Sequence, residues 1–427
     1  MKTAVLLVFL LLGIASCGIP LYEPYFQVAE RYNSEGDYTR AITMYIKAIG
    51  ENDKLAETYY GLAMAYYRRG DLEEAMLAFE KTISLDPKNE SAYERLASVH
   101  LDLGNPDTAL TICKKAINLD REFVGAYNTL GHAFLDSGRL DSAEATFTYA
   151  VKLAKRLVVR DRGIQDQSLY LDEQSEAFNG LGELSNARRQ YKYALEYFAS
   201  SISLTPQWDT PWTNKGVTYE GLGNSAAAQV CYQRAIDLSV ANLTAYKKLA
   251  EFYRRIGKDY DALNVYRSAL RVDPSNIDMY YGLADVYEKK GDHAHAIEAF
   301  ERILKYAPDD PIGYVRIGQL YLRGSDYDRA ITYFDEAAQI DARYAEAHDG
   351  LGEAFQAKGM LKEAQGAYEE AVACDSLFTF PLRHLGSLFI AQGKEAEGLR
   401  LFQRAAALGD IDAIIFLRSR RANEKEE

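Results

Sequence analysis

Apolar and small side chains recur at helical spacing along most of the chain, in short runs that turn signals interrupt. In residues 56–69 the apolar positions lie three and four residues apart, which is the spacing of one face of an α-helix. Gly70 ends this run with a residue that adopts the left-handed conformation common at helix C-termini, and Asp71 can cap the helix that follows. A second amphipathic run then extends to Asp86-Pro87. The stretch 56–89 therefore predicts two antiparallel helices joined by a tight turn.

This two-helix pattern recurs eleven times, at a period of 34 residues with a single step of 51 residues. Repeat position 8 is Gly or Ala in every copy, and position 20 is Ala in ten copies and Gly398 in the last. Small residues at both positions let two helices approach closely, and bulky residues at positions 4, 11 and 24 fill the space between copies. A helix pair of this length cannot bury its own apolar face, so the copies must stack. They begin at Tyr22, Ala56, Glu90, Val124, Ser175, Asp209, Leu243, Ile277, Pro311, Ala345 and Thr379.

The residues at the recurring positions identify a family resemblance. Trp212, Gly216, Tyr219, Ala228 and Tyr232 stand where the tetratricopeptide repeat family has its aromatic, Gly, Tyr, Ala and aromatic residues. The chain closely resembles that family. The resemblance implies an all-α fold, a right-handed α-solenoid of about eleven antiparallel helix pairs, whose concave groove is lined by the first helix of each pair and binds protein segments. The third copy departs from the pattern, with Cys113 where an aromatic residue is expected.

The repeats divide the chain into segments. The longer step between the fourth and fifth copies leaves an insertion of 17 residues, for which the sequence leaves two readings open: a tolerated surface loop, or an element that binds a partner or forms a dimer. The preceding helix can continue past Arg156, and Ser168 to Leu171 can form an apolar hook. At the other end, Asp410 can start a capping helix, and the open end of the eleventh copy would be covered by Ile411, Ile414, Ile415 and Leu417. The segments are 1–17 (signal peptide), 22–157 (repeats 1 to 4), 158–174 (insertion), 175–412 (repeats 5 to 11) and 413–427 (the rest of the capping helix and a polar tail).

The first 17 residues have the composition of an export signal. Lys2 precedes an apolar stretch from Ala4 to Ile14, which is shorter than the roughly 20 residues that cross a bilayer. Ile14-Ala15-Ser16-Cys17 resembles the lipobox of bacterial lipoproteins, in which the cysteine is acylated and becomes the mature N-terminus. The alternative is an ordinary secretory signal in which Cys17 is incidental. The resemblance implies lipidation of Cys17 and an anchored protein, and Gly18 after the cysteine favours the outer membrane.

Composition and motifs exclude several classes of function. The net charge of −13 and the pI near 5.2 argue against nucleic acid or anionic lipid as a general partner. No metalloprotease, nucleophile-elbow or phosphate-loop motif is present, and His293 and His295 lie two residues apart at a helix start, where their side chains diverge. We therefore expect no enzyme, no cofactor and no metal site.

The groove is the expected functional surface, and two sets of residues stand out on it. The first is a basic strip on the seventh and ninth copies, which either binds an acidic peptide or a C-terminal carboxylate, or is a solvated face whose charges pair between helices. The second is an aromatic surface on the second copy that suits apolar anchors of a partner. The candidate binding residues are Lys247, Lys248, Arg254, Arg255, Arg316 and Arg323 in the strip, and Tyr60 and Tyr67 in the aromatic surface.

These features together predict a lipid-anchored scaffold or adaptor of the bacterial cell envelope, facing the periplasm from the outer membrane. Its partners are proteins or peptide segments, including acidic ones, which would serve the assembly of an envelope complex. The alternative function is a component of polysaccharide secretion or modification that contacts carbohydrate or a synthase. The two differ in salt dependence, because peptide binding through charges weakens with salt and neutral glycan binding does not.

Overall fold

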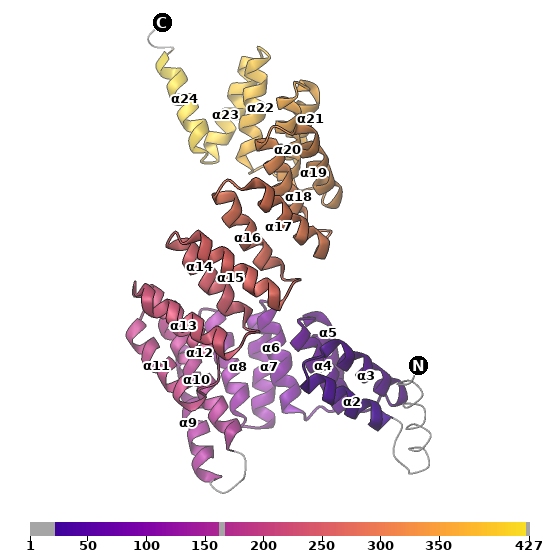
Figure 1. Ribbon diagram of the computed structural model, residues 1–427, viewed down its shortest axis with the longest axis vertical. Helices are drawn as coiled ribbons and strands as arrows, with labels where there is room; N and C mark the ends of the chain where they lie inside the picture. Colours follow the sequence, from indigo (N-terminus) through magenta and orange to yellow (C-terminus); the bar gives the residue numbers. More distant parts are fainter. Residues whose placement is uncertain (1–21, 162–166, 424–427) are drawn as a thin grey trace. The chain divides into compact units, whose positions relative to one another are not determined.

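The computed structural model describes residues 22–161 and 167–423, and all regular structure in these ranges is α-helical (Figure 1). The signal peptide and Cys17 lie outside the described residues. The chain forms two compact units, residues 1–239 and 240–427. In each unit, consecutive helices pack as pairs, and the pairs pack on their neighbours. The predicted all-helical repeat fold is confirmed.

The first unit contains the helix pairs of the first six repeats. In each pair the even-numbered helix comes first and carries repeat position 8. The pairs are α2 (Tyr22–Ser34) with α3 (Tyr38–Glu51), α4 (Ala56–Arg69) with α5 (Leu72–Leu85), α6 (Glu90–Asp102) with α7 (Pro106–Leu119), α8 (Val124–Asp136) with α9 (Leu140–Arg160), α10 (Ser168–Ala187) with α11 (Tyr191–Leu204), and α12 (Thr210–Gly221) with α13 (Ser225–Leu238).

The second unit contains the remaining five pairs and one further helix. These are α14 (Leu243–Arg255) with α15 (Asp259–Val272), α16 (Ile277–Lys289) with α17 (His293–Tyr306), α18 (Pro311–Arg323) with α19 (Tyr327–Ile340), α20 (Ala345–Ala357) with α21 (Leu361–Cys374), α22 (Thr379–Ala391) with α23 (Glu395–Ala407), and α24 (Ile411–Asn423). Of the helices in the described ranges, none combines the length and apolar character required to span a membrane.

The core of every repeat except the third centres on an aromatic side chain at position 24. Phe147 is fully buried, and a Cβ atom added to Gly131, at position 8 of the same repeat, would lie 2.5 Å from its ring. A Cβ atom on Gly180, at position 6 of the next repeat, would lie 2.4 Å from the same ring. The second unit repeats this arrangement with Phe334 between Gly318 and Gly350. Glycine at position 8 of one repeat and at position 6 of the next therefore leaves room for one aromatic ring to pack between two successive first helices.

The insertion lengthens two helices. Helix α9 continues to Arg160, as the sequence indicated, and reaches 21 residues. Helix α10 begins at Ser168, so Ser168 to Leu171 is its first turn instead of a separate hook. Leu157 is buried against α10, in a cluster that includes Ala177. The insertion thus adds packed helix to the fourth and fifth repeats, and most of it is not a loop.

Helix α24 covers the end of the last pair, as predicted, and the expected Leu417 packs there together with Phe416, which was not expected. Asp410 caps it by accepting a hydrogen bond from the Ala413 N–H at 2.8 Å. Phe416 stacks on Phe402 with ring centroids 4.0 Å apart. Ile411 and Ile415, expected from the sequence to cover the open end, are exposed. Their helix is rotated so that Phe416 meets the aromatic residue at position 24.

Candidate functional site

A cavity of about 900 Å³ lies in the first unit. Helices α4, α6 and α10 line it, together with the segment that joins α11 to α12. We call it the first-unit pocket. Its chemically distinctive lining residues are Tyr60, Tyr67, Glu94, Arg95, Ser98, Leu169, Asp172, Glu173, Glu176 and Trp208.

Helical spacing explains why these side chains share one face. Tyr60 and Tyr67 are seven residues apart on α4, and Leu169, Asp172, Glu173 and Glu176 follow a three- and four-residue spacing on α10. The two tyrosines are those that the sequence singled out for the groove, and the structure places both in this pocket. Tyr60 also packs edge to face on Phe79, with ring centroids 5.7 Å apart.

The α10 residues were missed at the sequence level, because three of them belong to the insertion. Leu169, Asp172 and Glu173 precede the fifth repeat and have no counterpart in the other copies. Their spacing continues that of Glu176 within the repeat, and this continuity was the available signal. The structure shows that the insertion builds one wall of the pocket.

Glu94 is buried in the pocket wall and fully bonded. Its side chain is 6% exposed and lies 3.1 Å from the Arg95 guanidinium. The hydroxyl groups of Thr129 and Ser98 donate to its Oε1 at 2.8 and 3.1 Å. The neighbouring Glu94 charge also raises the pKa of Arg95, although burial opposes the effect. Arg95 is therefore paired with Glu94.

Glu173 and Glu176 lack such a partner. Burial, followed by the proximity of Glu176, raises the pKa of Glu173 to about 7, although the nearby backbone N–H of Gly125 acts in the opposite direction. Burial also raises the pKa of Glu176, which is half-buried and lines the cavity. A Cβ atom on Gly125 would lie 3.3 Å from Glu173 Oε1, so glycine lets the start of α8 approach this carboxylate. The positive end of the α8 dipole favours a negative charge there.

The surface beside the pocket is acidic as well. A smaller cavity of about 240 Å³ shares Tyr67, Ser98 and Glu176 with the first-unit pocket. It adds Asp102 and Asp136, and burial raises the pKa of Asp136. His132 lies in the same cavity, 3.6 Å from Glu183. The first helices of repeats 2 to 5 therefore present a continuous surface in which carboxylates outnumber cations.

The basic strip lies in the second unit, and its cations are paired with acidic side chains of the same or an adjacent repeat. Each of its pairs joins side chains across or along the first helices, and Arg255 is exposed at the end of α14. Exposed pairs of this kind contribute about 0–1 kcal/mol each. The pairs are Lys247 with Asp278 at 2.5 Å, Lys248 with Glu251 at 3.5 Å, Arg254 with Asp285 at 3.3 Å, Arg316 with Asp285 at 3.0 Å and Glu288 at 2.8 Å, and Arg323 with Glu288 at 3.3 Å.

The pairing corresponds to the second reading that the sequence left open for the strip. An acidic ligand would have to compete with Asp278, Asp285 and Glu288 for the same cations. The binding role of the strip therefore stays a prediction.

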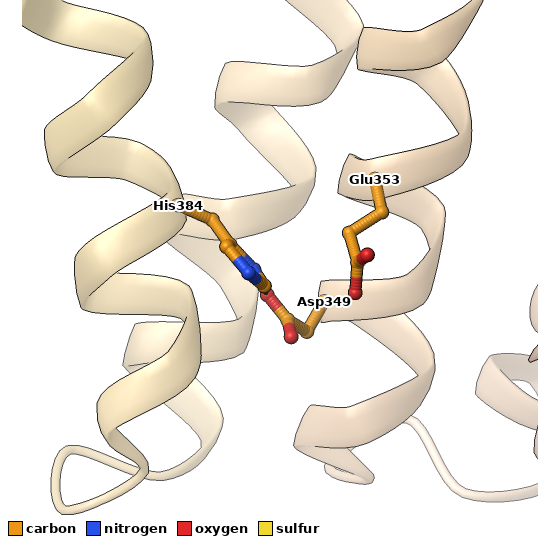
Figure 2. Close-up of side chains that lie close together, drawn as sticks. All are labelled: Asp349, Glu353 and His384. Atoms are coloured by element: carbon orange, nitrogen blue, oxygen red, sulfur yellow. The ribbon is translucent and has the colours of Figure 1, made fainter. Parts of the chain in front are cut away.

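One cluster in the described residues has the composition of a metal site. Asp349 and Glu353 lie one turn apart on α20, and His384 faces them from α22 (Figure 2). Their ligand atoms lie within 4.8 Å of one another, and histidine nitrogen and carboxylate oxygen are ligands that Zn²⁺ accepts. His384 Nδ1 and Asp349 Oδ1 are 2.8 Å apart, so a hydrogen bond already satisfies both. The sequence analysis missed this cluster because its members come from two repeats. His293 and His295 take no part in it, and His295 instead contacts Asp292 at 2.8 Å.

The His384–Asp349 pair predicts a pH-dependent stability of the second unit. Burial opposes the charge on His384, but the Asp349 hydrogen bond and nearby Glu353 outweigh it and raise the pKa of His384. This stabilisation is complete below the unfolded pKa near 6.5 and is lost as the pH rises through the folded pKa. His384→Gln should therefore cost about 1–2 kcal/mol at pH 6 and less at pH 9.

Thermal unfolding followed by circular dichroism measures this effect. Trp208 and Trp212 both lie in the first unit, so the unfolding of the second unit is the transition that tryptophan fluorescence does not detect. His293→Gln, at an exposed histidine of α17 in the second unit, is the control. An equal loss of stability at both pH values would contradict the assignment.

Family models match much of the chain. A model described as a TPR repeat matches residues 250–291. Models described as tetratricopeptide repeat match residues 56–89, 90–123, 124–156, 210–240, 277–310 and 315–377. No curated protein matches the sequence.

Several solved structures are similar to this chain. Yeast Tom70 is 16% identical over 95% of this chain and 96% of its own, with a TM-score of 0.41. YrrB, described as a TPR protein with an unusual peptide-binding site, is 20% identical over 44% of this chain and 97% of its own, with a TM-score of 0.37. MamA from Desulfovibrio magneticus RS-1 is 20% identical over 39% of this chain and 94% of its own, with a TM-score of 0.35.

Proposed function

The chain belongs to the tetratricopeptide repeat family, and on that basis we propose that it is a membrane-anchored scaffold that holds a segment of a partner protein in the first-unit pocket. Repeats of this family form a protein-interaction fold that is typically not catalytic. The observation that carries the proposal is the cavity of about 900 Å³ that three first helices and the insertion enclose. A cavity of this size accommodates several side chains of a bound segment.

The proposal places the protein in the bacterial cell envelope, anchored through Cys17. Two acyl chains on one residue give stable anchoring, because each buried CH2 contributes about 0.8 kcal/mol. Only Gly18 to Leu21 separate Cys17 from the start of α2. Four residues span at most about 14 Å. The first repeat would therefore lie close to the membrane, and partners would be proteins that assemble an envelope complex there.

Replacing the acylated cysteine tests the anchor. In Cys17→Ser cells, we expect the protein to move from the membrane fraction to the soluble fraction and to lose incorporated palmitate. Cys374→Ser, in the second unit, is the matched control and should leave both unchanged. A Cys17→Ser protein that stays in the membrane fraction as completely as the wild type would contradict lipid anchoring at this residue.

Blocking the pocket tests the scaffold function. Ser98 lines both the first-unit pocket and the smaller cavity beside it, so the larger side chain of Ser98→Tyr should occupy space in the pocket. We expect proteins captured from crosslinked membranes by the wild-type chain to be lost from Ser98→Tyr. They should be retained by Ser84→Tyr, at an exposed position of α5, and by Lys247→Glu/Lys248→Glu in the basic strip. Circular dichroism establishes that each variant folds. Equal capture by all four proteins would contradict the proposal.

A further inference from the structure

The first-unit pocket carries more negative than positive side chains. Glu94, Asp172, Glu173 and Glu176 line it, against Arg95 as the only Lys or Arg among its lining residues. Because Arg95 pairs with Glu94, the three carboxylates of α10 have no ion-pair partner among the described contacts. Burial raises the pKa of Glu176 more than the neighbouring His132 and Arg95 lower it.

These carboxylates are positioned, and not merely tolerated. The Gly125 N–H lies near the Glu173 carboxylate and the Asn128 side chain lies near that of Glu176, and each neighbour lowers the pKa of the carboxyl group beside it. The Asn128 amide also donates to the backbone carbonyl of Glu173 at 2.9 Å, which fixes α10 against α8. Burying a carboxylate without a counter-charge is unfavourable. Two such groups held side by side by α8 form a site that a cation would complete.

The other walls of the pocket are aromatic. Tyr60 and Tyr67 lie on α4, and Trp208 closes the pocket from the segment before α12. Aromatic faces attract ammonium and guanidinium groups within about 6 Å of the ring centroid. The aliphatic stem of a long basic side chain packs on the same rings. The carboxylates on one wall can therefore bind the charged group of such a side chain, and the aromatic rings on the other walls can pack on its aliphatic stem.

From these walls we infer that the first-unit pocket selects a lysine or arginine side chain of the partner segment, held by Glu173 and Glu176 against Tyr60, Tyr67 and Trp208. This inference rests on the proposed function and adds the chemistry of the partner. A bare metal ion fits this pocket less well. Among the described residues, three potential ligands lie close enough together to chelate an ion only in the Asp349 cluster of the second unit. The occupant is therefore an extended organic cation.

Selection from a random library of 12-residue peptides, with the full chain in detergent micelles as the target, tests the inference. We expect the selected peptides to share a Lys or Arg. Replacing that residue by Gln should weaken binding at least tenfold, and so should Glu173→Gln/Glu176→Gln in the protein. Glu74→Gln/Glu80→Gln, at two exposed acids of α5, is the matched control. Combining the peptide and pocket changes should weaken binding little further, because both remove the same contact.

The outcomes separate this inference from the proposed function. One outcome is that the selected peptides lack Lys and Arg, or bind the double Gln variant as tightly as the wild type, while Ser98→Tyr still abolishes their binding. This outcome would overturn the inference of a basic side chain and leave the scaffold function standing. Peptides that bind Ser98→Tyr as tightly as the wild type, or a library from which none is selected, would overturn both.

Discussion

Replacing Glu173 by glutamine should stabilise the first unit by about 2 kcal/mol at pH 8 while weakening recognition of the partner. The pKa of this carboxyl is raised from 4.5 to about 7 by burial and by neighbouring Glu176. Each pKa unit corresponds to about 1.4 kcal/mol, so ionising Glu173 in the folded chain costs about 3 kcal/mol. Glutamine keeps an acceptor for the Gly125 N–H but loses the attraction of the α8 N-terminus, which is about 0.3–1 kcal/mol.

The pH dependence of this effect has a definite sign. Between pH 4.5 and 7 the folded state holds the Glu173 proton more tightly than the unfolded state does. The wild type therefore loses stability from this group as the pH rises through that window, and the Gln variant does not. The two free energies of unfolding should converge near pH 4.5 and differ most above pH 7. Glu176 and Glu94 face this group as further acids, and Arg95 faces it as a cation.

Urea denaturation followed by tryptophan fluorescence measures the free energy of unfolding of the first unit, because Trp208 and Trp212 both belong to that unit. Glu74→Gln is the control, since its exposed side chain should change stability by less than about 0.5 kcal/mol. A Glu173→Gln variant that is less stable than the wild type at pH 8 would show that the carboxylate is a structural anchor. A carboxylate retained at a cost in stability is instead what a binding site requires.

Phe147→Ala should lower the free energy of unfolding of the first unit by about 3–5 kcal/mol. The ring is fully buried and fits between Gly131 and Gly180, so it joins two repeats. Both neighbours are glycines without side chains that could fill the space. The cavity would therefore remain, and both the lost burial and the cavity itself destabilise the unit.

The same fluorescence measurement tests this prediction, with Leu77→Ala as the matched control. Leu77 is a large apolar residue of the first unit that is 62% exposed, so its truncation should cost less than about 1 kcal/mol. A loss below about 1 kcal/mol for Phe147→Ala would mean that the two glycines close over the cavity, and that the ring does not determine the repeat spacing.

The fold was predictable from the sequence because its determinants are local and repeated. Gly70 and Asp71 mark a turn in any context, and a small residue at position 8 opposite a ring at position 24 recurs in register. Even departures were readable: Cys113 stands where Phe147 stands in the next repeat, and both are buried. The sequence explained Gly182 and Gly352 by packing, and the structure extends this to Gly180 and Gly350, which meet the ring of the preceding repeat.

The site was only partly predictable, because it depends on distances between repeats. Tyr60 and Tyr67 could be assigned to the groove from their repeat positions, and the structure places them together in the first-unit pocket. Glu173 could not be assigned, since it lies in the insertion, outside the repeat register. The cations of the basic strip were recognisable, but their pairing with Asp285 and Glu288 depends on how far apart adjacent first helices lie.

Photocrosslinking from the pocket rim tests the central claim most directly. Leu169 lines the first-unit pocket and is 59% exposed, so a benzoyl-phenylalanine there should not disturb the fold. We predict crosslinks in native membranes to partner peptides that carry a Lys or Arg within a few residues of the crosslinked position. The same probe at Leu77, on the second helix of its pair, should not yield them. Identical crosslinks from both positions, or crosslinked peptides without Lys or Arg, would contradict the account.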